Sequence, residues 1–92
     1  EIEAKLNNLP FIMESLVIEK EGKLVALVYP DYDTVDGTGI SHTDLPIIMQ
    51  QNLEEINKLV APYEKVASIQ LYPTEFEKTP KKSIKRYLYR NF

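Results

Sequence analysis

The chain has 92 residues and a formal net charge of −3, with 43% of its residues hydrophobic and 27% charged. This length allows one small domain with a modest core, and it excludes a deep catalytic cleft built by the chain alone. The absence of cysteine excludes disulfides and thiolate metal sites, and we expect a cytoplasmic protein.

The beginning of the chain predicts a helix followed by a β-hairpin. Three apolar residues at helical spacing predict a short amphipathic helix before Pro10: Ile2, Leu6 and Leu9. Two runs rich in Val, Leu and Ile follow at residues 13–20 and 23–29, with Glu21 and Gly22 as the turn. Both faces of the second run are apolar, which predicts a central strand covered on both sides.

The middle of the chain predicts a loop and a long helix. Residues 30–42 contain three aspartates and two glycines and predict a mobile surface loop without the features of a calcium loop. His42 has no second ligand nearby, so we predict a surface role for it and no metal site. Thr43 or Asp44 can cap the next helix, which Pro62 ends. Its core-facing stripe is Leu45, Met49, Leu53, Ile56 and Val60.

The last part of the chain predicts one more strand and one more helix. Residues 66–71 alternate in polarity and predict a half-buried strand. Thr79 and Pro80 suit the start of a final helix that would direct three residues to the core: Ile84, Tyr87 and Leu88. The order helix, strand, strand, long helix, strand, short helix predicts an α+β fold, in which helices pack against a small sheet of about three strands.

The charge of the chain reverses near its end. Residues 1–76 hold five basic and thirteen acidic side chains, whereas residues 77–92 hold six basic side chains and one acidic. Lys81 and Lys82 would lie in the first turn of the final helix, where the helix dipole disfavours cations. An anionic ligand at that helix start would explain them. A solvated basic surface is the more common alternative.

Tyrosines near these basic residues raise a second alternative, a small module that binds nucleic acid through residues 78–90. The tyrosines concerned are Tyr63, Tyr72, Tyr87 and Tyr89. The chain is acidic overall, and Tyr87 lies beside Leu88 at core-facing helical spacing. Core packing is therefore the better interpretation for most of them.

Three segments, in order, resemble one family. They are Leu59-Val-Ala-Pro-Tyr-Glu-Lys65, the strand at 66–72 and Lys78-Thr-Pro-x-x-x-Ile-Lys-Arg86. Together they look like the C-terminal domain of AMP-forming acyl-CoA synthetases, in the adenylate-forming superfamily. Glu1-Ile-Glu3 resembles the segment that follows the hinge in that family. The resemblance implies that residues 1–92 are a single C-terminal domain, with the large N-terminal adenylation domain and the hinge outside this sequence.

The resemblance also implies a two-step reaction. A carboxylate and ATP, with Mg²⁺, give acyl-AMP and pyrophosphate, and coenzyme A (CoA) then displaces AMP as the domain rotates. The ending Ile84-Lys-Arg-Tyr-Leu-Tyr89 looks most like long-chain fatty-acid members. The implied partners are the N-terminal domain, a fatty acid, ATP and CoA, with no nucleic acid, and a membrane surface for the parent enzyme only. A ligase acting on an acyl carrier protein is the alternative. Alone, the chain should bind no cofactor and catalyse nothing.

One position departs from the family pattern, which closes roughly as Lys-Thr-Pro-Thr-Gly-Lys-Ile-x-Arg. The catalytic lysine, which neutralises carboxylate and α-phosphate charge, aligns with Ser83, and a serine carries no charge. Lys82, at the glycine or leucine position, is a candidate substitute. Alternatively, the enzyme relies on other cations or favours thioester formation, or the serine is an engineered replacement. The other nucleotide-loop candidates are Lys78, Thr79, Pro80, Lys81, Lys85 and Arg86.

Overall fold

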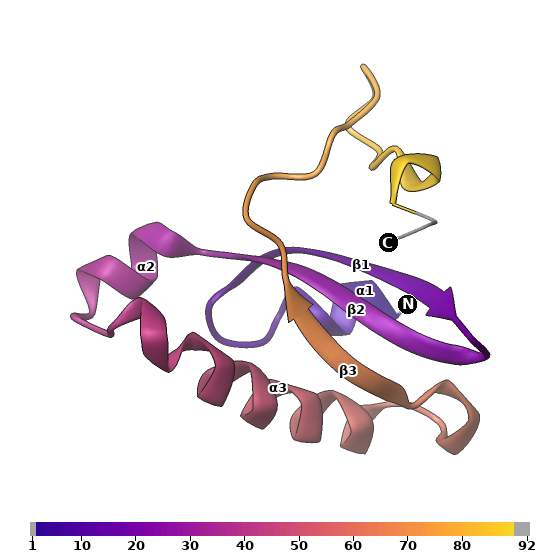
Figure 1. Ribbon diagram of the computed structural model, residues 1–92, viewed down its shortest axis with the longest axis horizontal. Coiled ribbons are helices and arrows are strands. Elements are labelled where there is room, and N and C mark those ends of the chain that lie inside the picture. The colour runs from indigo at the N-terminus through magenta and orange to yellow at the C-terminus, as the bar shows by residue number, and fades with distance from the viewer. Residues whose placement is uncertain (1, 90–92) are drawn as a thin grey trace.

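The computed structural model describes residues 2–89, in which a three-stranded sheet lies between a helical layer and the C-terminal segment (Figure 1). Helix α1 (Ile2–Leu6) leads into strands β1 (Ile12–Lys20) and β2 (Lys23–Pro30), and β3 (Val66–Leu71) completes the sheet. The strand order is β1-β2-β3, with β1 antiparallel and β3 parallel to β2. The α+β fold and the central second strand are therefore confirmed.

Helix α3 (Leu45–Leu59) packs across one face of the sheet together with α1 (Figure 1). The predicted apolar stripe is confirmed, since Leu45, Met49 and Ile56 are buried, and Leu53 and Val60 are partly buried against the same cluster. The sheet and the other helices contribute the rest of this core: Leu6, Ile12, Ala26, Val28, Val35 and Val66. The result is one aliphatic core under the sheet.

The segment predicted as a mobile loop contains a helix, α2 (Tyr32–Gly37), so that prediction was wrong. Asp31 caps the helix, because its carboxylate accepts hydrogen bonds from the N–H and the hydroxyl of Thr34 at 3.2 and 2.7 Å. Val35 is fully buried and holds α2 against the core. The local signal for this cap is present in the sequence, since Asp31 stands three residues before Thr34.

The start of α3 also differs from the prediction. Asp44 occupies the N-cap position without a side-chain hydrogen bond, and Ser41 instead caps the preceding 3₁₀ turn (His42–Asp44) through the N–H of Thr43. His42 lies at the surface, as predicted, where its Nε2 is 2.7 Å from a carboxylate oxygen of Asp36. Across residues 2–89, no group of His, Asp or Glu side chains is arranged to hold a metal ion.

The final helix predicted from Thr79 and Pro80 does not form. Residues 78–84 instead form a hairpin, in which Lys78 and Ile84 pair as an antiparallel bridge, and a single 3₁₀ turn (Arg86–Leu88) follows. We call residues 78–84 the C-terminal hairpin. Threonine and proline suit a turn as well as a helix start, and no buried apolar stripe is present to stabilise a helix.

The side chains predicted to be in the core fall into two groups. Tyr87 and Leu88 are exposed to 61% and 46%, and Tyr63 is exposed to 87%, so the core prediction was wrong for these three. Tyr89 is buried and Tyr72 packs against the same cluster, as predicted.

Within the described residues, no helix is both long and apolar enough to span a membrane.

Candidate functional site

The C-terminal hairpin is closed by backbone hydrogen bonds. The N–H of Thr79 donates to the carbonyl of Ser83, and the N–H of Lys82 donates to the carbonyl of Thr79, both at 2.8 Å. Pro80 is the second residue of this turn, where its fixed φ is favoured. Lys82 has a φ of 66°, the left-handed conformation typical of the last residue in a three-residue hairpin loop. Local turn geometry therefore fixes the backbone of residues 79–83.

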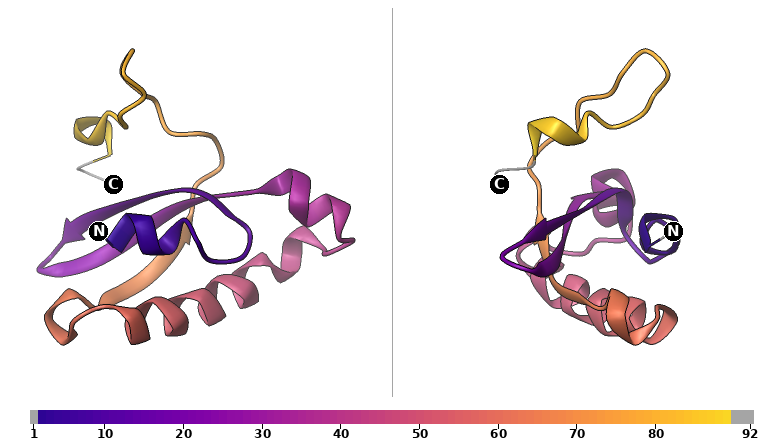
Figure 2. Two further views of the ribbon diagram at one scale, coloured as in Figure 1. Left: turned by 180° about the vertical axis from the view of Figure 1, so that it is seen from behind. Right: turned by 90° about the vertical axis from the view of Figure 1, so that its right-hand side faces the viewer.

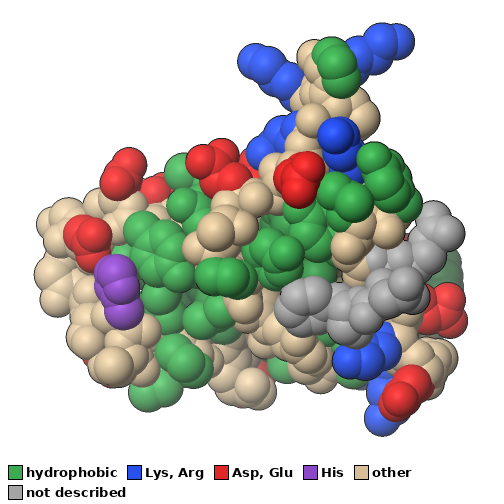
Figure 3. All heavy atoms as spheres, turned by 45° about the horizontal axis from the view of Figure 1, so that its top comes forward, with side chains coloured by type: hydrophobic (Ala, Val, Ile, Leu, Met, Phe, Trp, Pro, Cys, Tyr) green, Lys and Arg blue, Asp and Glu red, His purple; other side chains and the backbone are tan. Residues whose placement is uncertain are grey.

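The tip of this hairpin, residues 79–83, stands away from the sheet (Figure 2). Lys81, Lys82 and Ser83 are all exposed there. Figure 3 shows basic side chains projecting from this protruding end of the molecule. Within residues 2–89, neither Lys81 nor Lys82 makes an ion pair. The structure thus places both lysines and the serine together on a projecting tip, where another molecule or domain can contact them.

Lys78, by contrast, is directed back to the body of the domain. Its ammonium forms an ion pair with the carboxylate of Glu14 on β1 and donates to the carbonyl of Phe76 at 3.3 Å. The other oxygen of Glu14 accepts a hydrogen bond from the N–H of Phe76 at 3.2 Å. One carboxylate therefore holds both the backbone and a side chain at the start of the hairpin.

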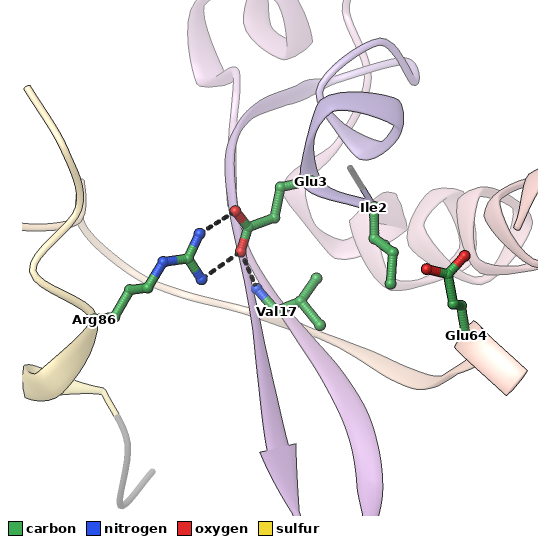
Figure 4. A pocket seen from close by; sticks show the side chains of 5 residues that line it. All are labelled: Ile2, Glu3, Val17, Glu64 and Arg86. Carbon is green, nitrogen blue, oxygen red and sulfur yellow. Dashed lines mark hydrogen bonds and ion pairs between the residues drawn. The ribbon is translucent and has the colours of Figure 1, made fainter.

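Arg86 is held in the same way just after the hairpin (Figure 4). Its guanidinium meets the carboxylate of Glu3 in a two-pronged ion pair, with Nη1 2.8 Å from Oε2 and Nη2 in contact with Oε1. The same Oε2 accepts a hydrogen bond from the N–H of Val17 at 2.8 Å. The hydrogen bond to Glu3 raises the pKa of Arg86 above its ordinary value. A shallow hollow of about 280 Å³ lies beside this pair, bounded also by Ile2 and Glu64.

An aromatic cluster fills the space under the C-terminal segment. The ring centroids of Tyr72, Phe76 and Tyr89 are 5.1 to 5.3 Å apart, and Tyr89 meets both other rings edge to face. The hydroxyl of Tyr89 accepts a hydrogen bond from the N–H of Glu77 at 2.8 Å. The cluster packs on the face of the sheet opposite α3, over three buried residues: Leu16, Val25 and Leu27. It anchors the segment from which the hairpin extends.

The remaining candidates have mainly local roles in the structure. The hydroxyl oxygen of Thr79 accepts a hydrogen bond from the N–H of Ser83 at 3.3 Å. The N–H of Lys85 donates to the carbonyl of Glu77 at 2.8 Å, and its ammonium makes no ion pair within the described part of the chain. Arg90, the last of the basic residues, lies outside the described residues.

Sequence reasoning did not identify Glu3 and Glu14. Their partners lie far along the chain, with 83 residues separating Glu3 from Arg86 and 62 separating Glu14 from Phe76. No local pattern indicates such pairs. The only signal was the excess of acidic residues in the part of the chain that precedes the basic end.

No family model and no curated protein matches the chain. Solved structures do match it. The adenylation domain of a carboxylate reductase from Mycobacterium chelonae aligns with a TM-score of 0.77 and 18% identity, over 96% of this chain and 15% of that one. A benzoate CoA ligase from Burkholderia xenovorans LB400 aligns with a TM-score of 0.70 and 17% identity, over 97% of this chain and 17% of that one. An acyl-CoA synthetase from Brucella canis aligns with a TM-score of 0.69 and 20% identity, over 98% of this chain and 16% of that one.

These alignments include nearly all of the chain, so the shared feature is the whole fold and not one motif. The chain has the fold of the small C-terminal domain of adenylate-forming enzymes. It spans only 15 to 17% of the length of the solved structures reported above.

Proposed function

We propose that this chain is the C-terminal domain of an AMP-forming acid–thiol ligase, and more narrowly of a fatty acyl-CoA ligase. The observation that carries the proposal is the hairpin tip. Two lysines with no ion-pair partner in the described part of the chain protrude where the sequence resembles the lysine loop of acyl-CoA synthetases. The likeness of the fold to an acyl-CoA synthetase and a benzoate CoA ligase supports it. The rest of the active site would belong to an N-terminal adenylation domain.

The proposed reaction has two steps. A carboxylate oxygen attacks the α-phosphorus of ATP, and the bond to pyrophosphate breaks, which leaves an acyl adenylate. The thiol of CoA then loses its proton and attacks the acyl carbon, and AMP leaves. Bound Mg²⁺ would reduce phosphate charge in the first step. The hairpin tip would supply an ammonium to the negative charge on the carboxylate and the α-phosphate.

Lys82 is the residue that we assign to this role. Its left-handed φ matches the glycine position that precedes the family lysine, which supports the alignment of that lysine with Ser83. A residue with a Cβ in this conformation costs about 1–2 kcal/mol. An exposed lysine beside the expected position, with no ion-pair partner within residues 2–89, suits a functional cation better than a structural one.

The test uses the full-length protein that contains these residues, assayed for carboxylate-dependent exchange of pyrophosphate into ATP. The carboxylates are acetate, benzoate, decanoate and palmitate. We expect exchange with the fatty acids, and a decrease of about 10²–10³-fold in Lys82→Ala, the scale for losing one group that stabilises transition-state charge. Lys58→Ala is the matched control, because Lys58 is exposed on α3, on the other side of the sheet; the expected change is below about threefold, typical of an exposed cation outside the reacting charge.

The outcomes separate the parts of the proposal. An absence of exchange with every carboxylate would overturn the ligase function. Exchange with wild-type rates in Lys82→Ala would overturn the role of Lys82 alone. Offering CoA or an acyl carrier protein as the acceptor tests the thiol substrate, because the exposed lysines suit the phosphates of CoA and an acidic carrier alike.

A further inference from the structure

We infer that Glu3 and Glu14 are positioning residues that hold the C-terminal hairpin so that its tip presents Lys82 in a fixed place. This inference rests on the proposed function, in which the ammonium of Lys82 must meet developing charge in another domain. Neither carboxylate lies at the tip. Each acts through a cation at one end of the hairpin, Glu14 through Lys78 and Glu3 through Arg86.

The hairpin needs such support because it has little of its own. Its only ladder pairing is the bridge between Lys78 and Ile84, and an isolated two-stranded hairpin is at best marginally stable in water. Residues 80–83 are exposed. Ile84 is the only hairpin residue among those packed against the second buried cluster. The tip therefore depends on how firmly the two ends of the hairpin are held.

Glu14 holds the first end by two separate contacts. Its side chain is 17% exposed and that of Lys78 is 29% exposed, so solvent screens this pair less than a fully exposed one. The hydrogen bond from the N–H of Phe76 fixes the carboxylate itself. Since Glu14 lies on β1, the start of the hairpin is tied directly to the sheet.

Glu3 holds the second end and is itself held. Its two oxygens face the planar guanidinium of Arg86, a geometry that restricts orientation as well as distance (Figure 4). The hydrogen bond from the N–H of Val17 anchors the carboxylate to β1. Helix α1, β1 and the turn that follows the hairpin thus meet at one carboxylate, so the segments on both sides of the hairpin are tied to β1.

This arrangement divides the basic residues near the end of the chain into two groups. Lys78 and Arg86 have carboxylate partners on the domain body, whereas Lys81, Lys82 and Lys85 make no ion pair within residues 2–89. Of the paired cations, Lys78 begins the hairpin and Arg86 follows it. Lys81 and Lys82 lie at the tip, and Lys85 lies just after the hairpin. The positions of the partners, and not the sequence, determine which cation remains available for a ligand.

The variants Glu3→Gln and Glu14→Gln test the inference, because glutamine keeps an oxygen that can accept from Val17 or Phe76 and removes the charge. Glu54→Gln is the matched control, since Glu54 is exposed on α3. In the chain itself, we expect several-fold faster amide exchange at the hydrogen-bonded N–H groups of Thr79 and Lys82 in the two test variants, with unchanged exchange in the strands. The control should match wild type.

In the full-length protein, the same variants should lower kcat for pyrophosphate exchange by about ten- to a hundredfold, the effect of a small misplacement of a catalytic group, with KM for ATP unchanged. Unchanged amide exchange at the tip would overturn the inference. Faster amide exchange combined with a wild-type kcat would also overturn it, because the ion pairs of Glu3 and Glu14 would then have a structural role only. A third outcome separates the two proposals: wild type shows no carboxylate-dependent activity, but amide exchange at the tip becomes faster in the variants. In that case Glu3 and Glu14 do hold the hairpin, and the proposed function fails.

Discussion

The two faces of the sheet are covered in different ways. On one face, helices α1 and α3 bury a continuous aliphatic core that includes Val28 and Ile56. On the other face, an irregular segment is held by three aromatic rings and by the ion pairs of Glu3 and Glu14. The first surface makes the domain stable. The second holds a hairpin whose tip lysines, Lys81 and Lys82, are exposed.

The difference matters because stability and presentation need different interactions. Aliphatic packing is strong but not directional, and it suits a core that only has to exclude water. Ion pairs and aromatic edges are weaker and directional, so they fix where a segment lies without burying it. The proposed function needs a tip that remains exposed, and the second kind of support allows this.

The largest expected effect is on the helix-covered face. Ile56→Ala removes a fully buried side chain between α3 and the sheet and should lower the free energy of unfolding by about 2–5 kcal/mol. Urea denaturation of the chain measures this change. The exposed Ile47→Ala on the same helix is the control, expected to lie within about 0.5 kcal/mol of wild type. Equal effects at the two positions would contradict the assignment of the core to this face.

A smaller effect is expected on the other face. Tyr89→Phe keeps the aromatic packing and removes the acceptor for the N–H of Glu77, so it should cost about 1 kcal/mol. Amide exchange at Glu77 should become faster, while exchange within β2 should not change. Faster exchange across the whole sheet would mean that the C-terminal segment is part of the main cooperative unit, which would weaken the distinction between the faces.

The sequence was sufficient for the elements whose signals are local. The stripe that contains Leu45, Met49 and Ile56 predicted α3, and apolar runs predicted all three strands within one residue at each end. The signals failed where one pattern has two structural meanings. Thr79 and Pro80 suit both a helix start and a turn, and only the absence of a buried stripe decides between them.

The candidate site was predictable in composition and not in geometry. The basic segment and its odd position at Ser83 are visible in the sequence. The partners of Lys78 and Arg86 are not, because Glu14 and Glu3 reach them only after the sheet has brought distant parts of the chain together. Long-range ion pairs leave no periodic signal, so the structure was needed to separate the cations that have carboxylate partners from those that have none within residues 2–89.

The smallest expected effect concerns Lys82, and its sign is opposite to the others. Lys82→Gly relieves a left-handed conformation that costs a residue with a Cβ about 1–2 kcal/mol, and glycine loses about 0.5–1 kcal/mol through its greater freedom in the unfolded chain. The net result should be a gain of about 0.5 kcal/mol in the free energy of unfolding. Lys82→Ala, which keeps the strain, is the matched control and should show no gain. Both variants should lose adenylation activity in the full-length protein. If Lys82→Gly is more stable and less active than wild type, the tip retains a lysine at a cost to the stability of the fold. If Lys82→Gly and Lys82→Ala have the same free energy of unfolding, the left-handed backbone of Lys82 carries no such cost.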